Sequence, residues 1–173
     1  MPELPEVEVC RRGIAPELAG EVVVGVTIRA PKLRHEIPRE LNDLLPGCQI
    51  AAVRRRAKYL LIDCRKAGVE GTLIIHLGMS GNLRFVPPDL PPEKHDHFDL
   101  VLPKQILRFA DPRRFGVVLW QPGPPAMADS HPLLATQGIE PLSDAFTADW
   151  LYAAIARRSG PIKPTLMDSH LVV

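Results

Sequence analysis

The extreme N-terminus combines an imino acid with two carboxyl groups. Pro2 follows Met1 directly, and Glu3 and Glu6 come within the next four residues. Removal of Met1, which is normal before so small a residue, exposes a secondary amine that titrates near ~8, against ~10.4 for a lysine. Such an amine attacks a sugar aldehyde carbon and forms a cationic iminium, while a neighbouring carboxyl group supplies or accepts protons. The pattern predicts Schiff-base chemistry at Pro2; a proline-rich helix entry without chemistry is the alternative.

A basic cluster follows further along the chain. Arg54, Arg55 and Arg56 stand just before Lys58. Such a cluster can bind the phosphates of a nucleic-acid backbone with a strong dependence on salt, whereas a solvated strand face is the alternative interpretation. A lysine side chain carries a proton near neutral pH. Lys58 therefore suits proton donation better than the covalent step, which favours Pro2 as the nucleophile.

The potential metal ligands are too few and too scattered to predict a metal site. His95 and His97 would share one face of a strand, but no third ligand stands close to them in the sequence. Cys10, Cys48 and Cys64 are odd in number and irregularly spaced, which favours buried thiols in a reducing cytosol over a disulfide framework. We expect neither a metal nor another cofactor in this chain.

These residues need a framework, and the pattern predicts one helix followed by eight strands. A helix is expected over residues 5–19, with Val7, Ile14 and Leu18 on one apolar stripe and Gly20 as its stop. A short helix is also expected at 41–45. Short apolar or β-branched runs between turn signals predict antiparallel strands at residues 21–29, 49–56, 58–63, 72–77, 82–86, 98–102, 106–110 and 116–121. The expected fold class is α+β: an antiparallel β-sandwich of two sheets flanked by an N-terminal helix.

Proline marks the division of the chain. Nineteen of the 173 residues are proline, about twice the usual ~5%. They cluster at 87–92 and 122–125, where loops or a linker are expected because proline disrupts central strands. We predict a first domain over residues 1–125 and a second segment, 126–173, with helices at 149–158 and 163–168. The apolar end, Leu171-Val172-Val173, predicts a chain cut short that associates with itself or is disordered.

Composition excludes several classes of protein. Hydrophobic residues make up 46% and charged residues 24% of the chain, which is ordinary globular composition. No apolar run approaches the ~18 residues of a membrane span, and the N-terminus lacks the basic and apolar regions of a signal peptide. We therefore expect a cytoplasmic protein with no membrane partner. The net charge is only +1, so bulk charge alone does not indicate nucleic-acid binding.

Six segments carry most of the chemically informative residues, in this order: Pro2-Glu3-Leu4-Pro5-Glu6-Val7-Glu8, Arg55-Arg56-Ala57-Lys58-Tyr59-Leu60, His76-Leu77-Gly78-Met79-Ser80-Gly81, Lys94-His95-Asp96-His97, Asp111-Pro112-Arg113-Arg114-Phe115-Gly116 and Ile162-Lys163-Pro164-Thr165-Leu166-Met167-Asp168. Their order and content resemble those of the formamidopyrimidine-DNA glycosylases, bacterial enzymes that excise oxidised purines. The resemblance covers essentially the whole chain.

The resemblance implies base-excision repair by an N-glycosylase that is also an AP lyase. Such an enzyme flips a damaged base, 8-oxoguanine or a formamidopyrimidine, out of duplex DNA, because the reacting carbon cannot be reached inside the stack. Pro2 would be the nucleophile at the sugar C1′ and Glu3 the acid that assists ring opening. Lys58 would serve β-elimination and phosphate contact, and Glu6 would lie close by.

The resemblance also assigns the contacts with DNA. Met79 would fill the gap left by the flipped base, and Phe115 would wedge between base pairs of the opposite strand. Arg113 would read the orphaned cytosine through its guanidinium fork. The remaining residues expected to bind DNA are His95, Arg114, Lys163 and Arg158, the last as an imperfect substitute for a basic residue that the family places just before the lysine motif.

The resemblance is incomplete at the C-terminal end. The family continues into a Gly-x-Gly-Asn-Ile-Tyr-Ala segment, which completes a helix–two-turns–helix clamp on DNA, and then into a four-cysteine zinc finger. Neither segment is in this sequence, so the family's zinc would belong to the missing finger. We expect residues 126–173 to be the incomplete start of that clamp domain and DNA affinity to be weakened. Damaged double-stranded DNA is the expected partner, without an obligate protein partner, in a bacterial cytoplasm near the nucleoid.

Two other functions fit parts of the same pattern. A non-catalytic DNA-binding or purely structural β-sandwich remnant would keep the fold without the chemistry. A glycosylase for oxidised pyrimidines, of the endonuclease VIII type, would keep the chemistry and change the lesion. Leu4 and the Arg113-Arg114-Phe115 run speak against this last alternative.

Overall fold

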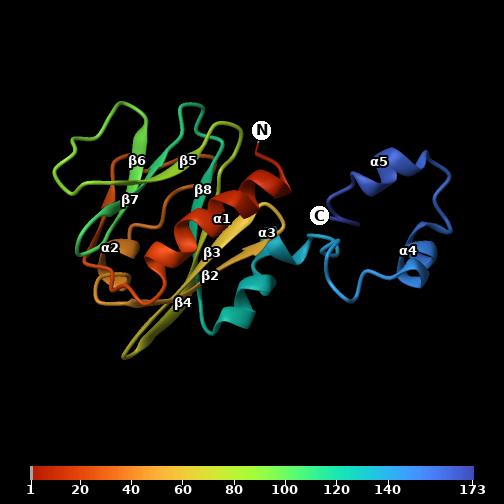
Figure 1. Cartoon of the computed structure of the whole chain (residues 1–173), viewed down its shortest axis with the longest axis horizontal. Helices are drawn as coiled ribbons and strands as arrows, with labels where there is room; N and C mark the ends of the chain where they lie inside the picture. Colours follow the sequence, from red (N-terminus) through yellow and green to blue (C-terminus); the bar gives the residue numbers. More distant parts are fainter. Residues whose placement is uncertain (1) are drawn as a thin grey trace. The chain divides into compact units, whose positions relative to one another are not determined.

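The computed structural model describes residues 2–173, so the expected removal of Met1 lies outside the described residues. The chain divides into two compact units, one ending at Ala128 and one spanning Asp129–Val173 (Figure 1). This division falls close to the boundary expected after residue 125. The functional assignment of the two parts stays a prediction.

Helix α1, Leu4–Leu18, opens the first unit and carries the N-terminal motif. Its backbone entry is fixed by Glu3, whose N–H donates to the carboxylate of Glu6 at 3.0 Å, as in the reciprocal caps that start many helices. Val7, Ile14 and Leu18 are buried on one stripe, as their spacing predicted. The helix packs against strands β2 and β3 (Figure 1). The N-terminal residues are therefore held against the sheet that bears Lys58.

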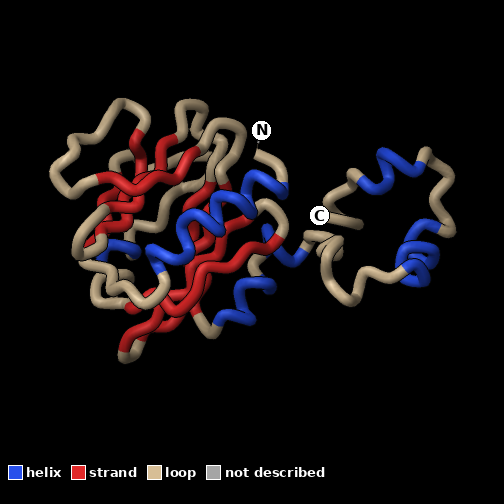
Figure 2. The backbone as a smooth tube through the Cα atoms, in the orientation of Figure 1, coloured by secondary structure: helices blue, strands red, loops and turns tan. Residues whose placement is uncertain are grey.

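Eight antiparallel strands form two four-stranded sheets, as expected for a β-sandwich (Figure 2). The first sheet has the order β1-β6-β7-β5 and the second β2-β3-β4-β8. The strands of the first sheet are β1 (Gly25–Ile28), β5 (Asn82–Val86), β6 (Asp96–Val101) and β7 (Ile106–Ala110). Those of the second are β2 (Gln49–Arg56), β3 (Tyr59–Lys66), β4 (Val69–His76) and β8 (Val117–Pro122). The short helix α2 (Leu41–Leu44) joins β1 to β2.

Strand β1 is shorter than the expected 21–29, for a geometric reason. Val22 forms an isolated bridge to Gln49, at the start of β2 in the second sheet. Three residues later Gly25 pairs with Val101 of β6 in the first sheet. The β-rich segment therefore crosses from one sheet to the other and counts as a strand only after the crossing.

The core lies between the sheets and includes the inner stripe of α1. Aliphatic residues of β3 and β4 face two phenylalanines and leucines of β6 and β7, and all of them are almost fully buried: Leu60, Ile62, Leu73, Ile75, Phe98, Leu100, Leu107 and Phe109. Burial of this apolar surface is the main source of stability for such a fold. The strand ends and the loops beyond them are thereby held on a rigid frame.

The second unit holds three short helices. They are α3 (Pro132–Ala135), α4 (Ala148–Ile155) and α5 (Ile162–Leu166), preceded by the 3₁₀ segment η1 (Pro125–Ser130) at the junction of the two units. The C-terminal end pairs with Ile139, whose N–H donates to the carbonyl of Leu171 at 2.9 Å while its own carbonyl accepts from the N–H of Val173 at 3.1 Å. The expected self-association or disorder of the apolar end stays a prediction.

Candidate active site

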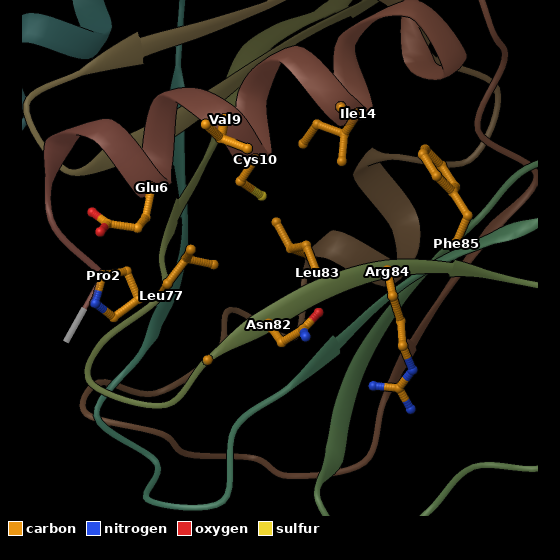
Figure 3. Close-up of a pocket in the computed structure, with 12 residues that line it drawn as sticks. Pro2, Glu6, Val9, Cys10, Ile14, Leu77, Asn82, Leu83, Arg84 and Phe85 are labelled. Atoms are coloured by element: carbon orange, nitrogen blue, oxygen red, sulfur yellow. The ribbon is translucent and has the colours of Figure 1, made fainter.

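Pro2 and Glu6 lie at one end of a pocket of about 440 Å³ between α1 and β5 (Figure 3). Pro2 is half-buried and Glu6 is exposed. The rest of the lining is largely apolar and includes Val9, Cys10, Ile14, Leu77, Leu83 and Phe85. A polar, reactive end on a mostly apolar concave surface is the usual composition of a small-molecule or base-binding site.

Lys58 joins the N-terminal residues through an ion pair. Its ammonium nitrogen lies 2.5 Å from the carboxylate Oε2 of Glu3, and both side chains remain partly exposed. Lys58 occupies the two-residue turn between β2 and β3, since Arg56 pairs with Tyr59 on either side of it. The structure thus brings Glu3, Glu6 and Lys58 together around the start of α1, next to Pro2. The arrangement places two carboxylates and a cation around Pro2, whose nitrogen is a free amine once Met1 is removed.

The turn that presents Lys58 is unusual in its backbone and is tied to α1. Ala57 adopts a positive φ of 52°, a conformation that residues other than glycine seldom take. Its carbonyl accepts a hydrogen bond from the Arg55 guanidinium at 2.9 Å. The same guanidinium donates to the carboxylate of Glu8, on α1, at 3.1 Å. Arg55 thereby links the helix to the Lys58 turn.

Two arginines of the basic cluster form ion pairs within the fold, and phosphate binding by the cluster stays a prediction. Arg54 forms an ion pair of 2.6 Å with the buried Asp63 on the neighbouring strand, and Arg55 is held by Glu8. The pKa of Glu8 is lowered to about 2, first by its hydrogen bond with Arg11 and further by Arg12 and Arg55, against the opposing effect of burial. These guanidinium groups stabilise the fold.

Two loops carry the exposed apolar side chains expected to enter DNA. Met79 lies between β4 and β5 and is 41% exposed, and Phe115 lies between β7 and β8 and is 44% exposed. The Arg113 guanidinium lies over the Phe115 ring, 5.0 Å from its centroid, a favourable cation–π arrangement. Arg114, between them, is exposed and has a positive φ of 56°. The structure therefore brings Met79, Arg113, Arg114 and Phe115 to adjoining loops.

His76 and Arg34 also belong to this region, although no role was expected for either. They line a pocket of about 470 Å³ together with Gly78, Met79 and Phe115. Arg34 comes from the long segment between β1 and α2, and its backbone N–H donates to the carbonyl of Gly116 at 3.2 Å. His76 was part of a recognised segment, but only the alternation of β4 could have shown that its ring turns toward this loop. Arg34 carries no sequence signal.

His76 is held neutral. Burial is the main cause that lowers its pKa to about 4, and the charges of Arg34 and Lys58 lower it further. Its Nδ1 accepts a hydrogen bond from the N–H of Gly78 at 2.9 Å, which leaves the proton on Nε2. The ring also packs on Tyr59, with the centroids 4.7 Å apart. The His76 ring therefore helps to fix the turn that carries Met79.

The rings of His95 and His97 lie edge to face, with their centroids 6.3 Å apart, and differ in burial. The ring of His97 is buried and its Nε2 lies 3.0 Å from the carbonyl of Asp111, while His95 is half-buried on the preceding loop. Burial is the main cause that lowers the pKa of His97. Across residues 2–173, no group of three or more histidine, cysteine, aspartate or glutamate side chains is placed to hold a metal ion. Nor does this part of the chain contain a helix long and apolar enough to cross a membrane.

The last two predicted site residues lie in the second unit. Lys163 is exposed in the first turn of α5. Arg158 is exposed as well, and its guanidinium forms an ion pair of 3.0 Å with Asp168. Within this unit, Lys163 presents its charge to solvent and Arg158 is partly neutralised.

Fold and site together define a class of protein: a two-sheet β-sandwich in which Pro2, just before the first helix, stands beside a lysine–glutamate ion pair, with exposed apolar and basic side chains on two nearby loops. Residues 1–118 match the family model of the formamidopyrimidine-DNA glycosylase N-terminal domain. The chain belongs to this family.

Known proteins of the family are similar over the whole chain. The formamidopyrimidine-DNA glycosylase of Dechloromonas aromatica (strain RCB) is 82% identical over 173 residues, and that of Janthinobacterium sp. (strain Marseille) is 52% identical. The chain spans 62% of the length of each of these relatives. A Lactococcus lactis Fpg in complex with abasic-site DNA superposes with a TM-score of 0.87 at 28% identity, covering 99% of this chain and 62% of that one. A complex of the L. lactis protein with DNA containing N7-benzyl-Fapy-dG gives the same TM-score at 29% identity and the same coverage.

Proposed function

We propose that this chain carries the catalytic part of a DNA glycosylase and AP lyase that removes oxidised purines, 8-oxoguanine and formamidopyrimidines, from duplex DNA. The observation that carries the proposal is the 2.5 Å contact between Lys58 and Glu3, beside Pro2 at the mouth of the largely apolar pocket. Residues 1–125 would form the catalytic domain. Residues 126–173 would begin the family's helix–two-turns–helix domain.

Pro2 performs the covalent step of the proposed reaction. Its nitrogen lone pair forms a bond to C1′ of the damaged nucleotide, while the bond from C1′ to the base breaks and the base leaves with the electron pair and takes a proton from solvent. Glu3 accepts the proton released by the amine and passes it to O4′ as the C1′–O4′ bond breaks. The product is an open-chain sugar joined to Pro2 as an iminium.

The lyase step follows from the same iminium. Because the cationic C1′=N bond withdraws electrons, water takes a proton from C2′, a C2′=C3′ double bond forms and the C3′–O3′ bond breaks, so the 3′ phosphate departs with the electron pair of that bond. The Lys58 ammonium, paired with Glu3, stabilises the negative charge of that phosphate. Every step uses side chains of this chain and solvent, so the proposal requires no cofactor.

The two exposed loops supply the proposed contacts with duplex DNA. Met79 fills the space left by the flipped base and Phe115 enters the opposite strand, which offsets the few kcal/mol that unstacking costs. Arg113, already oriented over Phe115, reads the unpaired cytosine. His95 and Arg114 contact phosphates on this unit, and Lys163 and Arg158 do so on the second unit.

Borohydride trapping tests the proposal, because it reduces the iminium to a stable protein–DNA adduct. The chain, with removal of Met1 verified by intact mass, is incubated with a duplex that carries one 8-oxoguanine opposite cytosine. We expect a covalent adduct that Pro2→Gly reduces at least tenfold. Pro5→Ala, which changes a proline of the same motif, should leave the yield unchanged. No adduct on either an 8-oxoguanine or an abasic duplex would favour a non-catalytic DNA-binding or structural protein.

A second candidate substrate is an oxidised pyrimidine. One solved L. lactis relative was crystallised with DNA containing such a lesion. Competition between 8-oxoguanine and an oxidised pyrimidine for trapping decides between the two, and we expect the purine lesion to win because Arg113 suits an orphaned cytosine.

A further inference from the structure

Asp111 is a wholly buried carboxylate to which the proposed reaction gives no role. One carboxylate oxygen accepts a hydrogen bond from the Ser80 hydroxyl at 2.7 Å. The other accepts from the backbone N–H of Gly116, also at 2.7 Å. Ser80 in turn accepts from the backbone N–H of Arg113 at 3.2 Å. One carboxylate and one hydroxyl thus join the loop that carries Met79 to the loop that carries Arg113.

The backbone of Asp111 extends the connection to a third segment. Its N–H donates to the carbonyl of His95 at 3.0 Å, and its own carbonyl accepts from the N–H of Arg114 at 3.2 Å. The same carbonyl contacts Nε2 of His97 at 3.0 Å. Residues expected to contact DNA from three loops therefore converge on one aspartate.

The loop that carries Met79 and the loop that carries Phe115 are also packed closely against each other. A Cβ added to Gly78, which has a φ of +66°, would lie 2.5 Å from the backbone nitrogen of Gly116 and 2.5 Å from the carbonyl carbon of Phe115. A Cβ on Gly116 would lie 2.9 Å from the backbone oxygen of His76, just before the Met79 loop. These contacts are with backbone atoms and cannot be relieved by a rotamer change. The two loops therefore cannot move closer together at these glycines.

The environment of Asp111 differs from that of the other buried carboxylates. Asp63 is held by the Arg54 guanidinium and Asp99 by that of Arg108, whereas within the described residues Asp111 forms no ion pair. Its two carboxylate oxygens accept hydrogen bonds from the two loops instead. Such charge-assisted bonds are roughly twice as strong as neutral ones, and removal of one leaves buried polar groups unsatisfied.

We propose that Asp111, acting through Ser80, is a positioning residue that makes the Met79 loop and the loop of residues 113–115 enter the duplex as one rigid body. The inference rests on the proposed function, since it concerns how the wedge is held. Preorganisation matters because ordering two separate loops on DNA would cost conformational entropy at the moment of binding. Asp111 touches no reacting atom in this account.

Ser80→Ala is the sharpest test, because it breaks the bridge between the loops and keeps the bond from Gly116 to Asp111. Trapping rates are measured on an abasic site in a duplex and on the same site in single-stranded DNA, which needs no wedge. We expect the duplex rate to fall about tenfold, the effect of one lost buried hydrogen bond. The single-stranded rate should stay within about twofold on the same grounds. Ser80→Thr keeps a hydroxyl and should restore the duplex rate.

Asp63→Asn is the matched control for a general loss of stability. Asp63 is 3% exposed and bound by Arg54 and Thr72, away from both loops. The Asp63→Asn substitution should lower the midpoint of thermal unfolding without changing the ratio of the duplex trapping rate to the single-stranded trapping rate. An unchanged ratio in Ser80→Ala overturns the inference. A chain that traps neither form of DNA overturns the proposed function instead.

A second measurement distinguishes failure of this inference from failure of the proposed function, because it requires no chemical reaction. A duplex with a tetrahydrofuran abasic analogue carries 2-aminopurine next to the site, and its fluorescence rises when a wedge unstacks it. At saturating protein, Ser80→Ala should give less than half of the rise seen with the unsubstituted chain. An equal rise, or no rise with the unsubstituted chain, contradicts the inference even where no adduct forms.

Discussion

At the scale of single residues, His76 shows how burial fixes a protonation state. Its ring is packed on Tyr59 and its Nδ1 is already used by the N–H of Gly78. Because the folded protein holds this ring neutral, with a pKa of about 4, the unfolded chain binds a proton at a higher pH than the folded chain does. Stability must then fall as the pH drops from about 6.5 toward 4.

The first prediction follows from this difference in proton binding. We expect the urea midpoint of the chain to decrease between pH 7 and pH 4.5, and His76→Gln to remove a clear part of that decrease. His35→Gln, which changes an exposed histidine, should retain it. Equal pH dependence in the unsubstituted chain and in His76→Gln would show that His76 is not buried as described.

Part of the site could be predicted at this scale and part could not. Glu3, Lys58, Met79 and Phe115 follow from ordered motifs. The ion pair of Arg54 could not be predicted, because a strand sequence does not reveal which carboxylate of the next strand its guanidinium will meet. His76 and Arg34 went unassigned because their importance comes from packing between distant segments.

At the scale of elements, α1 depends on Glu8 for its attachment to β2. The carboxylate takes hydrogen bonds from Arg11 and Arg12 on the helix and from Arg55 on the strand. Its pKa is lowered to about 2, first by Arg11. Because folding lowers the pKa of Glu8, the ionised carboxylate stabilises the folded protein at pH values above its ordinary pKa of 4.5. That stabilisation is lost as the pH falls toward 2.

The second prediction concerns Glu8→Gln. At pH 7 it should reduce the free energy of unfolding by about 1–3 kcal/mol, as expected for loss of hydrogen bonds to charged groups. It should also flatten the acid transition between pH 4.5 and 2. Glu17→Gln, an exposed change on the same helix, should do neither. Urea titrations followed by circular dichroism measure both effects, and a steep acid transition in Glu8→Gln would contradict the account.

The helices and strands were largely predictable from the sequence because apolar alternation and turn residues act locally. Residues 21–24 were the exception at the start of β1, since the segment changes sheets there, as the bridge from Val22 to Gln49 shows. The order of strands within each sheet, and the convergence of three loops on Asp111, depend on long-range pairing that no local pattern records.

At the scale of the whole molecule, the chain forms two compact units, each with its own internal contacts. In the second unit, Gly138 lies against the C-terminal end, so that an added Cβ would be 2.2 Å from the carbonyl carbon of Leu171. The backbone N–H of Gly138 also donates to the carbonyl of Ser169 at 2.8 Å. A side chain there must displace the last residues of the chain.

The third prediction is that Gly138→Ala releases the C-terminal end and spares the first unit. Carboxypeptidase should remove Val173 and Val172 at least tenfold faster than from the unsubstituted chain, because the protease acts on the opened end. Gly160→Ala is the matched control, since a Cβ there meets nothing within 4 Å. Equal digestion of both variants would mean that the pairing with Ile139 does not hold the end.

The central claim is that one atom, the nitrogen of the mature N-terminal proline, bonds to the deoxyribose. After borohydride reduction on an abasic duplex, the protein is digested and the peptide that carries the sugar remnant is sequenced by mass spectrometry. The account predicts the remnant on the nitrogen of Pro2. A remnant on the Nζ of Lys58 would contradict it.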